Sequence, residues 1–193
     1  LAVVSVSKGE GYSLHLLRAE SPGPDVGKMT PRLKQSAKLL YIIYIVLTVI
    51  EIILLLAGGM PVFDSFCTAF GTAGTGGFGV KNDSIAGYSQ YIQIVVTVFM
   101  ALFGINFNIY FLVLLRSWKN LFRDEELWGY LGIMLGSILL ITWNVAPVFQ
   151  YNWGEAFQQS AFQVSSVMTT TGFSTIDYNT WPQFSRSLLA MLM

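Results

Sequence analysis

Two short stretches of the chain are rich in threonine and glycine and share the dipeptide Gly-Phe. The first covers 72–79 with the sequence TAGTGGFG, and the second covers 169–174 with the sequence TTTGFS. Gly77 in the first aligns with Gly172 in the second, a separation of 172 − 77 = 95 residues. Glycine permits backbone conformations in which successive carbonyl groups turn toward one axis. Such a row of oxygens can replace the hydration shell of a cation.

We therefore expect both stretches to coordinate a cation through backbone oxygens. The candidate ligands are the carbonyl groups of Thr75, Gly76, Gly77, Thr170, Thr171 and Gly172. Phe78 and Phe173 are expected to brace the two loops from behind. The segment 74–79 also satisfies the dinucleotide pattern G-x-G-x-x-G, but that motif needs a preceding strand and a following helix. Here it lies between apolar runs typical of membrane helices, so we favour the cation interpretation.

The amino-acid composition indicates the class of protein in which these loops lie. Hydrophobic residues make up 53% of the 193-residue chain and charged residues only 11%, against about 25% charged residues in soluble domains. Eleven basic residues balance eleven acidic ones, so no basic excess suggests a nucleic-acid partner. The single His15 and single Cys67 exclude a His-pair zinc site and an intrachain disulfide. The chain is therefore expected to be an all-α integral membrane protein.

Three apolar runs are long enough to cross a bilayer as helices: 39–57, 92–115 and 127–150. Each Thr/Gly stretch follows a shorter apolar segment, 61–73 or 154–168, of a length typical of re-entrant helices. The C-terminal end of such a helix carries partial negative charge, which favours a cation at the membrane centre.

Basic residues cluster at 28–38 and at 116–123, and both segments are expected on the cytoplasmic face. The connections 58–91 and 151–183 are then external. The predicted organisation is the end of a preceding helix and a cytoplasmic linker (1–38), a span–pore loop–span repeat (39–115), a cytoplasmic loop (116–126) and a second repeat truncated in its last helix (127–193). We expect the chain to be an internal piece of a longer protein.

The loops with the pattern Thr-x-Gly-Phe resemble the selectivity filters of potassium channels. They more closely resemble those of the Trk/Ktr/HKT superfamily of potassium transporters, in particular the bacterial pore subunit of the TrkH/KtrB type. Residues 18–32 look like that family's cytoplasmic linker. Residues 59–78 look like its second pore loop, and residues 161–175 look like its third.

The resemblance implies repeats two and three of a pseudo-fourfold subunit that takes up K+ across the bacterial inner (plasma) membrane. It implies that the protein lets an ion permeate and is not an enzyme. On this resemblance the transported ion is K+, and no cofactor is expected in this chain. Expected partners are the remaining pore repeats, a second subunit in a homodimer, a cytosolic nucleotide-binding regulatory subunit and membrane lipid. Nucleic acid is not expected.

Two alternatives stay open. A sodium or weakly selective cation transporter is one, because the loops have a single aligned glycine each and depart from the channel sequence Thr-Val-Gly-Tyr-Gly. A membrane-embedded enzyme using Glu51 or Asp177 is the other, although the inventory of acids and histidines that such a site needs is missing.

Five further polar residues carry expectations. Asn106 and Asn108 lie midway along the second long run, two residues apart. They cannot share one helix face, so we expect one to face a water-filled cavity and the other to link helices. Glu51 lies within a span, and we favour a role in holding two helices together over a functional one. Asp83 and Asp177 follow the loops and either concentrate cations at the mouth or are solvated loop acids.

Overall fold

The computed structural model of the chain describes residues 33–106, 109–110 and 124–193, and these ranges are helical without a strand. The chain divides into two compact units, 1–42 and 43–193. Only 33–42 of the first unit is described, and both threonine–glycine loops lie in the second unit. The expectations for 1–32, Asn108 and 111–123 lie outside the described residues.

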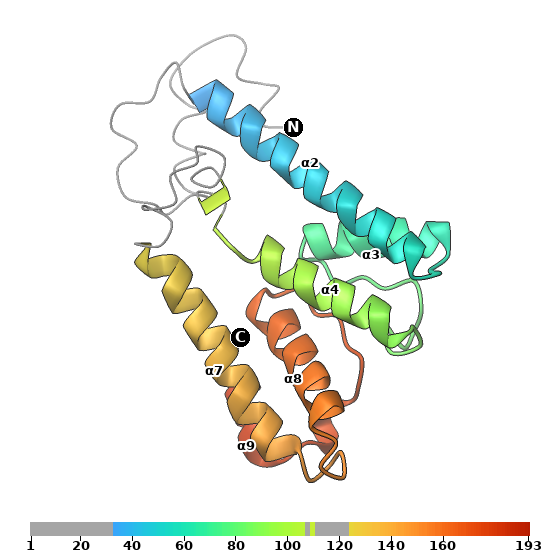
Figure 1. The fold of residues 1–193 in the computed structure, drawn as a ribbon, viewed down its shortest axis with the longest axis vertical. Helices are drawn as coiled ribbons and strands as arrows, with labels where there is room; N and C mark the ends of the chain where they lie inside the picture. Colours follow the sequence, from blue (N-terminus) through green and yellow to red (C-terminus); the bar gives the residue numbers. More distant parts are fainter. Residues whose placement is uncertain (1–32, 107–108, 111–123) are drawn as a thin grey trace. The chain divides into compact units, whose positions relative to one another are not determined.

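The described elements follow the predicted order of long and short helices (Figure 1). They are α2 (Leu33–Ala57), α3 (Val62–Ala73), α4 (Gln90–Phe103), α7 (Glu125–Val145), α8 (Trp153–Met168), the 3-10 helix η2 (Tyr178–Thr180) and α9 (Gln183–Leu192). Helices α3 and α8 agree with the predicted short helices to within one residue at each end. The Asn152 side chain caps α8 by accepting a hydrogen bond from the Glu155 amide.

Two described helices are long and apolar enough to cross a membrane, Lys38–Ala57 and Glu125–Val145. Only 22% and 33% of the residues in their most apolar stretches are buried inside the protein. Large side chains such as Ile53 and Trp143 are exposed on them. This combination is expected of helices whose outer surface faces lipid and not of the core helices of a soluble domain.

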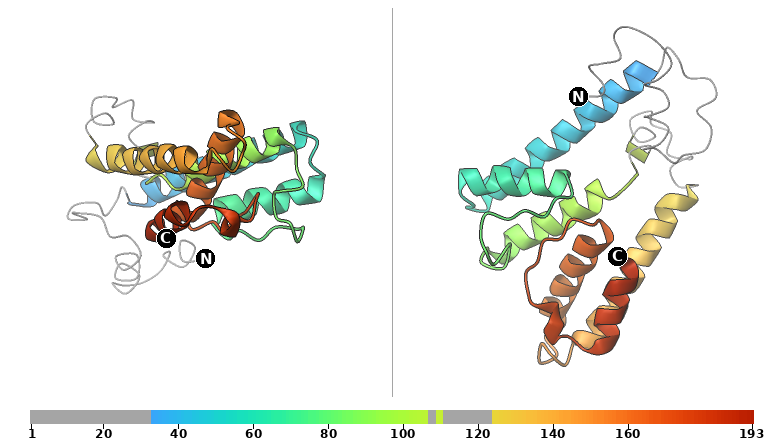
Figure 2. Two further views of the ribbon diagram at one scale, coloured as in Figure 1. Left: turned by 90° about the horizontal axis from the view of Figure 1, so that it is seen from below. Right: turned by 180° about the vertical axis from the view of Figure 1, so that it is seen from behind.

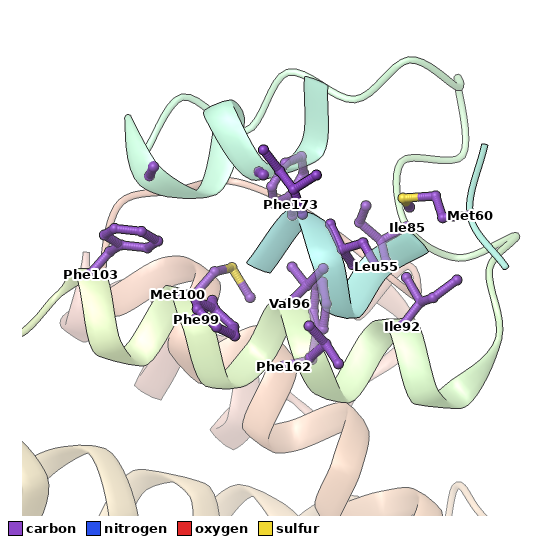
Figure 3. Close-up of a cluster of buried hydrophobic side chains, with 14 residues drawn as sticks. Leu55, Met60, Ile85, Ile92, Val96, Phe99, Met100, Phe103, Phe162 and Phe173 are labelled. Carbon is purple, nitrogen blue, oxygen red and sulfur yellow. The ribbon is translucent and has the colours of Figure 1, made fainter. Parts of the chain in front are cut away.

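One hydrophobic core joins the two predicted repeats. Helix α4 packs against α3 of its own repeat and also against α8 of the next one, while α7 and α9 pack around α8 (Figure 2). Phe162 and Phe173 from the second repeat are buried in the same cluster as Leu55, Val96 and Met100 from the first (Figure 3). Because this cluster contains both repeats, neither is packed as an independent domain.

The structure departs from the sequence prediction in the second span, where we expected an unbroken helix over 92–115. Helix α4 ends at Phe103, and Gly104 is its C-cap. A Cβ atom at Gly104 would lie 2.5 Å from Thr169 Cγ2 and 2.6 Å from the Tyr130 hydroxyl oxygen. The close approach of these two side chains leaves room there for glycine alone.

Neighbouring tyrosines satisfy backbone groups at this helix end. The Tyr130 hydroxyl donates to the carbonyl oxygen of Ala101 at 3.0 Å, and the Tyr110 hydroxyl donates to that of Leu102 at 2.6 Å. Carbonyls at a helix end lack intrahelical partners and are costly in a membrane unless other groups bind them. The break is therefore supported by side chains from the surrounding structure.

We predict that Gly104→Ala destabilises the whole protein by about 1–3 kcal/mol, because the new methyl group overpacks the contact with Thr169 and Tyr130. The measurement is thermal unfolding in detergent. Gly132→Ala is the control, since a Cβ atom there meets nothing within 4 Å and alanine favours helix by up to about 1 kcal/mol. Equal behaviour of the two variants would contradict the close packing at Gly104.

Candidate cation site: the two threonine–glycine loops

The two loops share an uncommon backbone conformation at equivalent positions. The φ angle is positive at Thr75 (48°) and Gly77 (62°) in the first loop, and at Thr170 (56°) and Gly172 (86°) in the second. The residues between them do not have positive φ, so the hand of the backbone alternates along each triplet. Alternation of this kind turns neighbouring peptide groups toward the same side.

Both loops also leave their helices through the same hydrogen bonds. The amide of the residue after the C-cap binds the carbonyl three residues back, and the next amide binds the carbonyl five residues back, as in a Schellman motif. The bonds are Thr75 to Thr72 (3.1 Å) and Gly76 to Gly71 (2.8 Å), and Thr170 to Val167 (3.0 Å) and Thr171 to Ser166 (2.9 Å). All four are related by the same 95-residue offset that aligns the sequences.

Because of these bonds, the N–H groups and the carbonyl groups of the loops differ in whether they have hydrogen-bond partners. The N–H groups of 74–76 and 169–171 point back to the ends of α3 and α8. No backbone or side-chain donor among the described residues binds the carbonyl oxygens of 75–77 or 170–172. Unpaired carbonyls at membrane depth are unfavourable unless a ligand or water binds them. The six predicted ligand groups thus have their oxygens free.

The two loops are in direct contact. A Cβ atom at Gly77 would overlap the carbonyl oxygen of Thr171. Nothing lies within 4 Å of the corresponding position at Gly172. Thr171 itself is buried, and its hydroxyl is 2.8 Å from that of Thr169. The structure therefore brings together two ligand groups that are far apart in sequence.

The two phenylalanines that follow these glycines have different environments. Phe173 is 1% exposed and lies against Gly71 on α3, where its Cζ atom would be 3.0 Å from an added Cβ (Figure 3). Phe78 is 83% exposed among the described residues, and its ring lies beside Gly76 of its own loop, so the expectation that it braces the loop stays a prediction. Phe173 packs on the short helix of the preceding repeat, and Phe78 has no preceding repeat among the described residues.

Comparison with known proteins identifies the family. The sequence matches the family described as "TrkH: Cation transport protein" over residues 1–193. The chain belongs to the TrkH family. The solved structure of the potassium transporter TrkH from Vibrio parahaemolyticus has a TM-score of 0.80 and 30% identity over 92% of this chain and 39% of that one. The predicted all-α membrane fold of the Trk type is thereby confirmed.

Two curated relatives are similar over most of this TrkH-family chain. It is 36% identical to the Trk system potassium uptake protein TrkH of Salmonella typhimurium over 182 residues, which are 91% of the chain and 37% of the relative. It is 35% identical to the Trk system potassium uptake protein TrkG of Escherichia coli K12 over 170 residues, 86% and 35% respectively. The chain spans little more than a third of the length of these proteins.

Asn106 lies in the segment after the end of α4 and is exposed. Its amide nitrogen donates to both carboxylate oxygens of Glu126, at 2.9 and 3.1 Å. Glu126 is in the first turn of α7, where acidic residues are common for dipole reasons alone. The sequence therefore offered no signal for this pairing, which connects the end of α4 to the start of the next repeat.

The acids near the loop mouths are also engaged. Asp177 caps η2 by accepting hydrogen bonds from the backbone amide (3.0 Å) and side chain (2.8 Å) of Asn179. Asp64, in the first turn of α3, accepts a 2.6 Å hydrogen bond from the Tyr88 hydroxyl. Burial and this carboxylate together raise the pKa of Tyr88 above its ordinary value.

Glu51 is fully buried on α2. Thr72 on α3 faces it, but the Thr72 hydroxyl donates to the Thr68 carbonyl oxygen at 2.9 Å. Neither carboxyl oxygen of Glu51 has a hydrogen-bond partner among the described residues. Glu51 therefore forms no hydrogen-bonded link among the described residues, and its expected role in holding two helices together stays a prediction.

We predict that substitutions at the two aligned glycines differ in severity. In the whole protein, Gly77→Ala should reduce K+ uptake more than Gly172→Ala. Both strain a left-handed backbone by about 1 kcal/mol, but only the first also overlaps the Thr171 carbonyl. Gly79→Ala is the milder comparison, because φ is not positive there and its Cβ, at 3.3 Å from Ser84 Cα, would make a tight contact but not overlap a backbone atom. Uptake lost in Gly79→Ala but kept in Gly77→Ala would mean that the filter is misplaced.

We predict that Glu51→Leu raises the free energy of unfolding of the whole protein by about 1–3 kcal/mol. A buried polar group without a partner carries a desolvation penalty of that size, and leucine fills a similar volume. Glu51→Gln, which keeps the polarity, should change stability less. A lower unfolding temperature for Glu51→Leu would show that the carboxyl group has a partner in the complete protein.

Proposed function

We propose that this chain supplies two of the filter loops of a potassium uptake pore. A K+ ion sheds water at the outer mouth and binds the carbonyl oxygens of the two triplets, 75–77 and 170–172. It then passes into an aqueous cavity and on to the cytosol, driven by the membrane potential. The observation that carries the proposal is a pair of equivalent loops in which the amides of 74–76 and 169–171 bond back to the preceding helix, while the carbonyl groups of 75–77 and 170–172 accept no hydrogen bond from the described residues.

The electrostatics of the loops suit a cation. Each triplet continues from the C-terminal end of a short helix, α3 or α8, where the helix dipole places partial negative charge. Among the described residues these two helix ends have no basic side chain in their last turn. Carbonyl oxygens and helix C-termini are the groups that membrane proteins use to coordinate dehydrated alkali ions.

Potassium is favoured over sodium as the transported ion. Both loops keep a glycine at the aligned position, and the curated relatives are named potassium uptake proteins. The open side of Gly172 and the exposed ring of Phe78 leave room for further repeats. In this proposal they are supplied by the rest of the full chain, which acts in the plasma membrane as a homodimer with a cytosolic nucleotide-binding regulator. The function needs no cofactor, bond chemistry or nucleic acid.

We predict that the whole protein restores growth of a K+-uptake-deficient bacterium at low external K+, and that residues 1–193 alone do not. Two loops leave half of the coordination shell of the ion unfilled. The measurement is growth together with uptake of K+ and Na+. Uptake of Na+ at the same rate as K+ would contradict the K+ assignment in favour of an unselective pore. Conduction by the isolated chain would contradict the four-loop requirement unless two copies assemble.

A further inference from the structure

A chain of hydrogen-bonded side chains connects the two repeats at the outer ends of α4 and α8. Its centre is Gln93 on α4, which is 8% exposed. The amide nitrogen of Gln93 donates to the carbonyl oxygens of Ala86 and Tyr88, at 3.4 and 3.2 Å. Its amide oxygen accepts from the side-chain nitrogens of Gln158 and Gln159 on α8, at 3.1 and 3.3 Å. Gln93 thus uses both ends of its amide to join the outer loop of the first repeat to α8 of the second.

The chain continues to the second threonine–glycine loop. The side-chain oxygen of Gln159 accepts a 2.5 Å hydrogen bond from the Thr175 hydroxyl. Thr175 is 8% exposed and lies three residues after Gly172. Gln93 is therefore connected through one intermediate side chain to the outer end of the loop that carries Thr170, Thr171 and Gly172.

A second connection runs in parallel through the backbone. The amide of Ile85 donates to the carbonyl oxygen of Ser174 at 3.1 Å, and the amide of Ser174 donates to the Ser84 hydroxyl oxygen at 3.2 Å. The outer loop of the first repeat, residues 80–89, therefore binds the second filter loop directly at Ser174 and indirectly at Thr175.

This outer loop is itself fixed to the first repeat. Ile85 is buried in the shared core. The Tyr88 hydroxyl binds Asp64 at the start of α3, and the Lys81 ammonium lies 4.0 Å from the centre of the Tyr88 ring. Helix α3 carries the first filter loop at its other end. The outer loop thus connects the second filter loop to α3, the helix that bears the first filter loop.

We propose that Gln93 is a positioning residue for ion selectivity, which holds the second filter loop at a set distance from the first through Gln159 and Thr175. It is not a ligand of the ion, because its whole amide is engaged with protein groups. Selectivity between K+ and Na+ depends on the spacing and rigidity of the carbonyl oxygens, and that spacing is set between repeats. This role rests on the proposed function of the two loops as a potassium filter.

The test uses the whole protein reconstituted in vesicles, with uptake of K+ and Na+ measured for Gln93→Leu, for Thr175→Val and for the double variant. Each single change removes hydrogen bonds of the bridge at nearly constant volume. We expect the K+/Na+ uptake ratio to fall about two- to tenfold in Thr175→Val, which removes one hydrogen bond. It should fall at least as far in Gln93→Leu, which removes four. Because both residues act through one chain, the double variant should fall no further than the more severe single variant.

Gln90→Leu is the matched control. Gln90 is one turn earlier on the same helix, is exposed, and donates to Gln158. Gln158 also binds Gln93, but the connection from Gln93 to Thr175 runs through Gln159, which Gln90 does not bind. Its K+/Na+ ratio should match that of the wild type. Thermal unfolding in detergent is measured for every variant, so that a change of ratio is read only in folded protein.

The outcomes separate the two proposals. If the wild type takes up no K+, the proposed function fails. If the wild type selects K+ and both Gln93→Leu and Thr175→Val keep its ratio while folded, the positioning role is overturned and the function stands. If Gln93→Leu does not fold, Thr175→Val decides: an unchanged ratio in that folded variant assigns the bridge to stability alone and overturns the proposal.

Discussion

Backbone that lies at membrane depth must have its polar groups satisfied within the protein, and this constraint explains most of the described structure. In both threonine–glycine loops the amides directly after the helix, those of 74–76 and 169–171, bond back to that helix, so these donors are satisfied locally. The carbonyl groups of 75–77 and 170–172 accept no hydrogen bond from the described residues, and a cation is a ligand that can bind several carbonyl groups at once. In the proposed filter, the carbonyl groups that these bonds leave unpaired are the candidate ligands of the cation.

The same constraint accounts for the broken helix between the two repeats. Where α4 ends after Phe103, carbonyl oxygens near the helix end receive hydroxyl groups from Tyr110 and Tyr130. The break also lets Gly104 lie against Thr169 at the start of the second loop. An uninterrupted helix would need no such hydroxyl partners, so the tyrosines and the glycine form one arrangement that connects α4, α7 and the second loop.

Each repeat contacts the filter loop or the short helix of the other. The second repeat places Phe173 on α3 and Ser174 on the outer loop of the first. The first repeat places Gly77 against the carbonyl of Thr171. Among the described residues, the ring of Phe78 is exposed and nothing lies within 4 Å of a Cβ atom at Gly172. These are the two surfaces on which a neighbouring repeat would pack. On the outer side, a glutamine-rich hydrogen-bonded bridge accompanies the apolar contact of Ile85 with the shared core. In the proposed role of Gln93, this bridge sets the spacing of the two loops.

The sequence by itself determined the class of protein, the bounds of the short helices and the positions of the two loops. Low charge, long apolar runs and a 95-residue repeat of Thr and Gly are local properties, and they are visible without coordinates. Neither the left-handed backbone at Thr75 and Thr170 nor the end of α4 at Phe103 could be predicted, because threonine rarely adopts positive φ and the apolar run continues beyond Phe103. Phe78 and Phe173 occupy equivalent sequence positions, yet one is exposed and the other buried. Only the tertiary structure decides between them, because burial depends on which repeat lies beside each residue.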